Sequence, residues 1–138
     1  MRRIAALLAV VFLSACTREI DQSTRPDAIT GSYQLHTYAG RSLPAVVSAD
    51  SAGTWEVVGG ELVIATDQSW SETVNYRFTK GTLVQMSTFG SSGSWVFMAD
   101  YAYMMFNDKV DNTQFSGTAA GGTLTLELVN GNSLVFRR

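Results

Sequence analysis

The chain has 138 residues, 46% of them hydrophobic, and it carries a formal net charge of −2 with a single cysteine and a single histidine. This length suits one small domain built around one hydrophobic core. The mildly acidic charge argues against nucleic acid as a partner, and a single cysteine excludes an internal disulfide.

The first fifteen residues have the pattern of a bacterial export signal. Arg2 and Arg3 precede an apolar run from Ile4 to Leu13, which is the order of charged and apolar regions in a secretory signal peptide. The run is shorter than the roughly 20 apolar residues that span a bilayer. We therefore expect residues 1–15 to direct export and then to be removed.

Cys16 follows Leu13, Ser14 and Ala15. The stretch resembles a bacterial lipobox, in which a leucine and two small residues precede a cysteine that marks cleavage and is diacylated. The resemblance implies that Cys16 is the lipidated mature N-terminus, held at a membrane by several acyl chains. In the Gram-negative pattern an aspartate after the cysteine retains the protein at the inner membrane, so Thr17 implies the outer membrane, with the domain facing the periplasm. The alternative is a secreted protein with one unpaired thiol.

Residues 16–30 are mostly polar and show no sustained apolar period. They predict a flexible tether between the lipid and a domain at residues 31–138. A short amphipathic helix is the alternative for this segment.

From Gly31 onward the sequence is typical of an all-β protein. All twelve glycines lie in this region, among frequent β-branched and aromatic residues that favour strands. In Trp70–Phe78 apolar and polar residues alternate, with Glu72 interrupting the apolar side, a period that fits a strand and not a helix. Strands are expected at residues 32–38, 45–49, 55–58, 61–65, 70–78, 83–86, 94–98, 101–106, 113–118, 124–128 and 134–136.

Glycine-containing pairs predict the turns between these strands. Asn130-Gly131, between two alternating runs, predicts a hairpin with a type I′ turn, in which both central residues have positive φ. Gly59-Gly60, Lys80-Gly81 and Gly121-Gly122 predict further tight turns.

Trp95–Phe106 is apolar on every side, and we interpret it as two strands that turn near Ala99-Asp100, with a helix as the alternative. The tight turns between these short strands predict a single antiparallel up-and-down barrel, formed by eight to ten of them, rather than a two-sheet sandwich. An even number of strands places the last strand beside the first and removes both exposed edges.

Gly31-Ser32-Tyr33-Gln34-Leu35, followed by Gly40-Arg41-Ser42-Leu43-Pro44, resembles the opening of bacterial lipocalin-like lipoproteins. These proteins begin with Gly-x-Tyr-x-Leu and a Gly-x-x-Leu-Pro turn, and the resemblance implies a calyx-like barrel. Lipocalins proper have Trp in place of Tyr33, beneath an arginine of the last strand. By this likeness Arg137 or Arg138 is expected over Tyr33 as a cation–π partner; two solvated terminal arginines are the alternative.

We expect no catalytic residue, metal or cofactor. His36 is a lone histidine without a cysteine partner, which argues against a zinc site or a catalytic triad. Asn107–Asn112 is rich in oxygen ligands but lacks the glycine and final glutamate of an EF-hand, so it predicts a charged turn. Glu72 would have a raised pKa if it faced the interior and would then suit an amine-bearing ligand; exposure at a strand end is the alternative.

Most aromatic residues are expected to fill the barrel, and some to bound a pocket. The predicted ligand-binding residues are Trp70, Glu72, Tyr76, Trp95, Tyr103 and Phe115. The sequence therefore predicts a non-catalytic, lipid-anchored envelope protein that binds a small hydrophobic molecule or lipid fragment. An open interior cavity beyond about 300 Å³ would favour this role, and an interior filled by side chains would favour an interaction module. One alternative is an interaction module whose packed barrel presents Gly90–Gly93 or Asn107–Asn112 to an envelope protein; a weaker one is an enzyme that uses Glu72 and a tyrosine.

Overall fold

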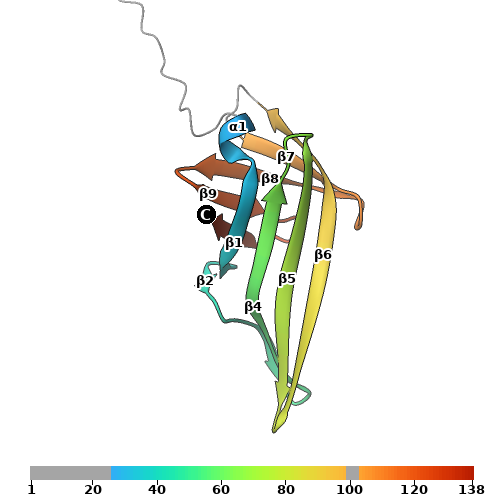
Figure 1. The fold of residues 1–138 in the computed structure, drawn as a ribbon. Helices are drawn as coiled ribbons and strands as arrows, with labels where there is room; N and C mark the ends of the chain where they lie inside the picture. The colour runs from blue at the N-terminus through green and yellow to red at the C-terminus, as the bar shows by residue number, and fades with distance from the viewer. Residues whose placement is uncertain (1–25, 99–102) are drawn as a thin grey trace, which may run out of the picture.

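The computed structural model describes residues 26–98 and 103–138, which form an antiparallel β-barrel with one helical turn at its end (Figure 1). The all-β barrel predicted from the sequence is confirmed. The elements are α1 (Pro26–Ile29), β1 (Gly31–Tyr38), β2 (Arg41–Ser42), β3 (Ala45–Asp50), β4 (Gly53–Ile64), β5 (Ser69–Lys80), β6 (Leu83–Met98), β7 (Tyr103–Asp108), β8 (Thr113–Ala120), β9 (Thr123–Glu127) and β10 (Ser133–Arg137). No helix among these residues has the length and apolar character needed to cross a membrane.

The barrel closes through its first strand. β1 pairs with β10 on one edge, where Gln34 lies opposite Arg137, and with β4 on the other, where Gly31 lies opposite Ile64. The expected meeting of the first and last strands is therefore confirmed. β2 and β3 are additional to this ring, because β2 pairs with the end of β1 and β3 with the beginning of β4.

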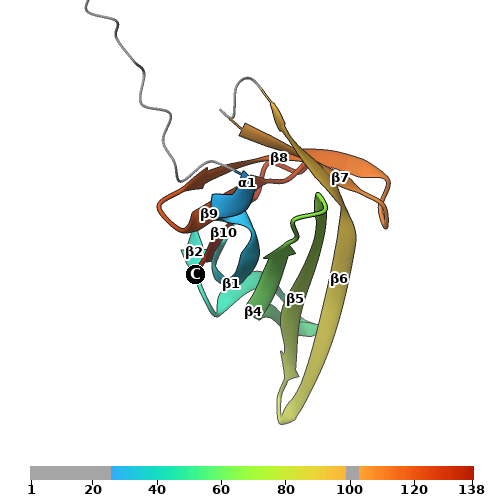
Figure 2. The same ribbon diagram turned by 45° about the horizontal axis from the view of Figure 1, so that its top comes forward.

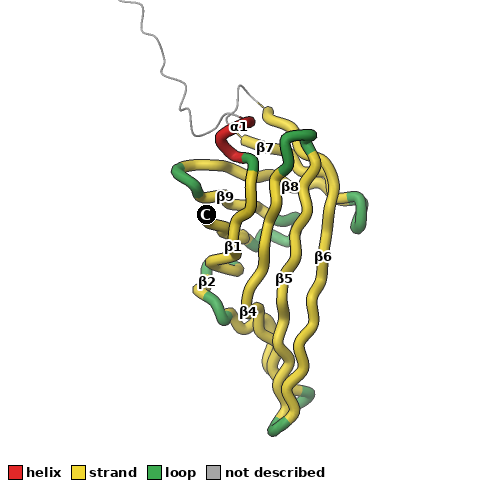
Figure 3. The backbone as a smooth tube through the Cα atoms, viewed as in Figure 1, coloured by secondary structure: helices red, strands yellow, loops and turns green. Residues whose placement is uncertain are grey.

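At one end the barrel continues into a four-stranded extension, which we call the flange. It consists of β3 together with Gly53–Val57 of β4, Tyr76–Lys80 of β5 and Leu83–Ser87 of β6. β6 is 16 residues long and lies beside β7 only from Gly93 onward, so it belongs to the ring at one end and to the flange at the other (Figure 2). Figure 3 shows the flange projecting beyond the remaining strands.

Two glycine-rich segments differ from the sequence prediction. Gly59-Gly60 is not a turn but lies inside β4, at a bulge in the pairing with β5. Gly90–Gly93 is not a loop but lies inside β6, where it joins two expected strands into one. A Cβ on Gly93 would overlap the carbonyl oxygen of Asn107. At this position glycine permits the close approach of β7 rather than a change of direction.

The hairpin at Asn130-Gly131 is confirmed, since it joins β9 to β10. The type I′ turn is wrong: Gly131 has a φ of 79°, but Asn130 does not have a positive φ. The amide of Gly131 donates to the carbonyl of Leu128, and the amide of Leu128 donates to the carbonyl of Asn132. These bonds define a longer loop.

The aromatic stretch near residue 100 is part of two strands. β6 ends at Met98 and β7 begins at Tyr103, so the helix considered for Trp95–Phe106 does not form in the described part of the stretch. The turn expected at Ala99-Asp100 lies outside the described residues.

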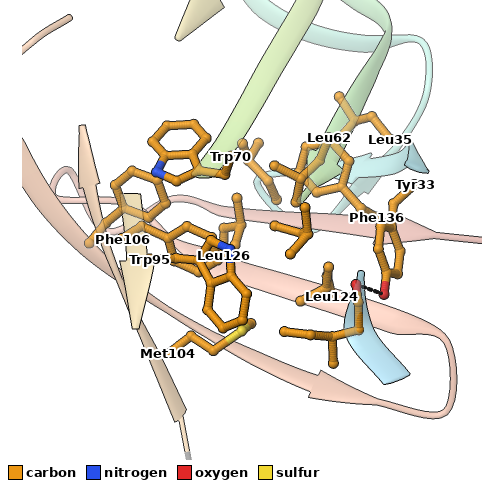
Figure 4. Packing of buried hydrophobic residues seen from close by; sticks show 14 of the residues in the cluster. Tyr33, Leu35, Leu62, Trp70, Trp95, Met104, Phe106, Leu124, Leu126 and Phe136 are labelled. Carbon is orange, nitrogen blue, oxygen red and sulfur yellow. Dashed lines mark hydrogen bonds between the residues drawn. The ribbon is translucent and has the colours of Figure 1, made fainter. Parts of the chain in front are cut away.

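Large side chains fill the half of the barrel nearest α1 (Figure 4). Phe106 and Phe115 stack with their ring centroids 5.2 Å apart, and the Trp70 ring stands edge-on to both of them. The other members of this core include Tyr33, Leu35, Leu62, Trp95, Met104, Leu124, Leu126 and Phe136. This end of the barrel is therefore filled by packed side chains.

The helical turn α1 and the last residue cap the packed end. Ile29 is buried, and its carbonyl accepts a 2.6 Å hydrogen bond from the Tyr33 hydroxyl. The guanidinium carbon of Arg138 lies 4.6 Å from the centroid of the Tyr33 ring, and Arg138 Nη2 donates to the Tyr33 hydroxyl oxygen and to the carbonyls of Ala28 and Thr30. Of the two candidate arginines, it is Arg138 that makes this contact. The packed domain thus includes α1, within the segment expected to be a tether.

This cap predicts different effects for the two terminal arginines. Arg138→Ala removes the cation–π contact and three hydrogen bonds, so we expect it to lower the free energy of unfolding by about 1–2 kcal/mol. Arg137→Ala, at an exposed neighbouring position, is the matched control and should change it little. Urea unfolding followed by tryptophan fluorescence measures both, and equal effects would show that the cap does not stabilise the barrel.

Candidate ligand pocket

A pocket of about 420 Å³ opens at the end of the barrel opposite α1, where the flange begins. It lies between β5 and β6 on one side and, on the other, the end of β1, the beginning of β10 and the β7–β8 and β9–β10 connections. Its apolar and aromatic wall is formed by Tyr38, Val74, Tyr76, Phe89, Phe115, Leu128, Val129 and Leu134. The volume falls within the range of roughly 300–1,000 Å³ that is usual for small-molecule sites.

The structure brings three of the six predicted ligand-binding residues to this pocket. Glu72, Tyr76 and Phe115 line it. Trp70 and Trp95 are each 2% exposed and belong to the packed core. Tyr103 lies outside the pocket, because the buried β7 side chains alternate with it along the strand.

Several lining residues were not predicted from the sequence. Tyr38 ends the first strand, Phe89 lies in the middle of the long β6, and Asp108 is the last residue of β7. Asp108 was assigned to a charged turn, although it continues the alternation of Met104 and Phe106, which the structure shows to be buried. That alternation is the signal by which Asp108 could have been found.

Strand alternation places Glu72 on the inner face of β5, between Trp70 and Val74, which are both buried. Its neighbours across the sheet are Leu62 on β4 and Ser91 on β6. β5 continues for eight residues beyond Glu72, so the strand-end position considered for it is wrong. Glu72 lies at the boundary between the packed half of the barrel and the pocket.

The carboxyl group of Glu72 has one oxygen without a hydrogen-bond donor in the described structure. This oxygen, Oε1, is buried. Burial, with a further contribution from the negative charge of Asp108, raises the pKa of Glu72 from 4.5 to about 7.

Asp108 has the opposite environment, although it is only 8% exposed. Its Oδ2 accepts a 2.5 Å hydrogen bond from the Ser91 hydroxyl, and its Oδ1 accepts bonds from the amides of Val110 and Asp111 at 2.8 and 3.2 Å. Burial acts to raise the pKa of Asp108, but these three donors outweigh it and the pKa is lowered. The pocket therefore contains one carboxylate that is held ionised and another that titrates near neutral pH.

Aromatic rings form the rim beside these carboxyl groups. Tyr76 and Phe89 meet edge-to-face with their centroids 5.4 Å apart. Burial, together with the neighbouring Tyr38 and Glu72, raises the pKa of Tyr76 to about 12, so its hydroxyl stays protonated. Phe89 is 62% exposed and offers its ring to the open side of the pocket.

No protein-family model matches this chain, and no curated protein sequence matches it significantly. The pocket combines an apolar wall with a few polar groups that converge at one place, a combination typical of sites that bind small molecules.

The raised pKa of Glu72 predicts a pH-dependent stability. Between pH 4.5 and about 7 the unfolded chain releases the Glu72 proton while the folded protein retains it, so stability falls as pH rises through this window, by about 3 kcal/mol. Glu72→Gln removes this term, so the variant should be more stable than the parent protein above pH 7, by a similar amount.

Urea unfolding from pH 4 to 8 measures this difference. Glu127→Gln, at an exposed position on β9, is the control and should follow the parent curve. A Glu72→Gln variant whose stability ran parallel to the parent over the whole range would contradict a buried carboxyl group with a raised pKa.

Proposed function

We propose that this protein is a lipid-anchored cell-envelope protein, akin to bacterial lipocalin-like lipoproteins, whose barrel binds a small hydrophobic or amphiphilic molecule without catalysis. The observation that carries the proposal is the 420 Å³ pocket at one end of an otherwise packed barrel. A barrel that served only as a scaffold would be expected to fill both halves with side chains.

The position of the anchor fits such a binding role. In this proposal the lipid is attached to Cys16, as the lipobox resemblance implies, and the described chain begins at α1, on the packed end. The pocket opens at the opposite end. A domain held in this way would lie near a membrane, which is a source of hydrophobic ligands. Its pocket would open on the side facing away from the point of attachment.

A bulky side chain placed in the lining tests whether the pocket binds a ligand. The chain from residue 16 onward, with Cys16→Ser to avoid a lipid of its own, is titrated with a lipophilic fluorescent dye. Thr113 is exposed and lines the pocket, so Thr113→Trp should fill part of the cavity and weaken dye binding by about tenfold or more. Thr118→Trp, at an exposed position on the same strand outside the pocket, should bind as the parent does. Absence of saturable dye binding in the parent would end this part of the proposal.

The anchor is tested by mass and by fractionation. The mature full-length protein should begin at Cys16 and carry acyl chains, and Cys16→Ser should move it from the membrane fraction to the soluble or unprocessed fraction. Thr17→Asp should shift it from the outer to the inner membrane. An unmodified Cys16 in the mature protein would refute the anchor.

A second candidate function is an interaction with another envelope protein through the free edge of β6. Among the described strands, none pairs with this edge from Leu83 to Gly90. Leu83, Val84, Met86 and Phe89 are exposed along it, and β6 contains no charged residue. Edge strands are usually protected by charges or covered by other elements, so this unprotected edge favours strand addition by a partner. Gly90–Gly93 lies within the strand and is not a recognition loop.

A further inference from the structure

Resting on the proposed function, we propose that the pocket selects amphiphiles that carry a protonated amine, with the ammonium group bound between Glu72 and Asp108. The proposed function requires only that a hydrophobic molecule enters the pocket. The inference adds the charge of its headgroup and the residues that recognise it.

The charges that line the pocket all have the same sign. The charged residues that line the pocket are Glu72, Asp108 and Asp111, and the described lining contains no lysine or arginine. A fatty acid would bring another negative charge against these carboxylates without a cation to compensate it. An ammonium group would be attracted by all three of them, so the lining discriminates against anionic amphiphiles as well as favouring cationic ones.

One carboxyl oxygen in the pocket has no hydrogen-bond donor in the described structure. Glu72 Oε1 is buried without a donor, whereas Asp108 is already supplied by Ser91, Val110 and Asp111. Ser91 lies opposite Glu72 in the sheet and donates to Asp108, so the two carboxyl groups face the same part of the pocket. An ammonium group has three donors and no acceptor, which is what an unpaired carboxylate beside a second negative charge requires.

Aromatic and apolar side chains surround the carboxyl groups of the pocket. Tyr76, Phe89 and Phe115 provide ring surface near the headgroup, and aromatic faces attract cations. Val74, Leu128 and Leu134 extend the apolar lining for a hydrocarbon tail. A short alkyl chain with one ammonium group matches both parts of the pocket.

The same geometry gives binding a direction with pH. The titratable groups that share the pocket with Glu72 are Tyr38, Tyr76, Asp108 and Asp111, and Asp108 is held ionised by its three hydrogen bonds. Glu72 is the group with a pKa of about 7. Ammonium binding should therefore strengthen as pH rises from 5 to 8, because Glu72 gains a negative charge over this range and an ionised carboxylate attracts the cation more strongly than a neutral carboxyl group does.

Three probes with equal tails separate the headgroup from the hydrocarbon: decylamine, decanol and decanoate, each below its micelle concentration. Binding to the chain from residue 16 with Cys16→Ser is measured by calorimetry or dye displacement. At pH 8 decylamine, whose ammonium group has a pKa of about 10, should bind about tenfold more tightly than decanol, and decanoate should bind more weakly than both. Acidification to pH 5 should weaken decylamine binding and leave decanol binding unchanged.

Glu72→Gln should remove most of the preference for decylamine and retain decanol binding, while Glu127→Gln should behave as the parent. Binding of decanol or decanoate as tightly as decylamine, or a preference that survives Glu72→Gln, would overturn the headgroup inference and leave the proposed function intact. Failure of all three probes to bind would overturn the proposed function itself.

Discussion

The structure depends on one strand that has partners on both edges. β1 pairs with β10 through residues at the two ends of the domain and with β4 through Gly31–Gln34. These pairings turn an open antiparallel sheet, which would expose two edges, into a ring. We call these closing pairings of β1 the seam. Arg138 stabilises the seam, because its side chain contacts the Tyr33 ring and donates hydrogen bonds to the carbonyls of Ala28 and Thr30. Closure of the barrel and capping of its packed end are thus one arrangement.

The length of that seam explains why the two ends differ. β1 pairs with β4 only over Gly31–Gln34. Beyond this section the same edge of β1 pairs with β2, and the same edge of β4 pairs with β3. Side chains of the short closed section meet across a narrow interior and pack to completion around Trp70 and Phe106. Past this section β4, β5 and β6 continue into the flange. The facing strands end there, and the interior opens as the pocket.

Much of this fold was predictable because it follows from local alternation. The period of two in Trp70–Phe78 assigned β5, and the placement of the last strand beside the first followed from strand number and hairpin order. The errors came from glycine, which is common both in turns and where backbones approach closely. Nothing in Gly59-Gly60 or Gly90–Gly93 reveals that β5 or β7 lies against it. Only three of the six predicted ligand-binding residues line the pocket, for a related reason. Alternation identifies which side chains face the interior, but the length of the β1–β4 pairing determines which of them lie in the packed core and which line the pocket.

The two pocket carboxyl groups differ in how far the protein itself supplies them with hydrogen-bond donors. Asp108 satisfies its oxygens with a hydroxyl and two amides of the β7–β8 turn, so its charge has a structural role that needs no ligand. Glu72 has no such donors at Oε1, and a buried polar atom without a partner destabilises the fold. An apolar residue would continue the face formed by Trp70 and Val74 without that penalty. A position that breaks the local pattern and lowers stability is expected where binding compensates for it, and Glu72 lies where the packed core gives way to open space.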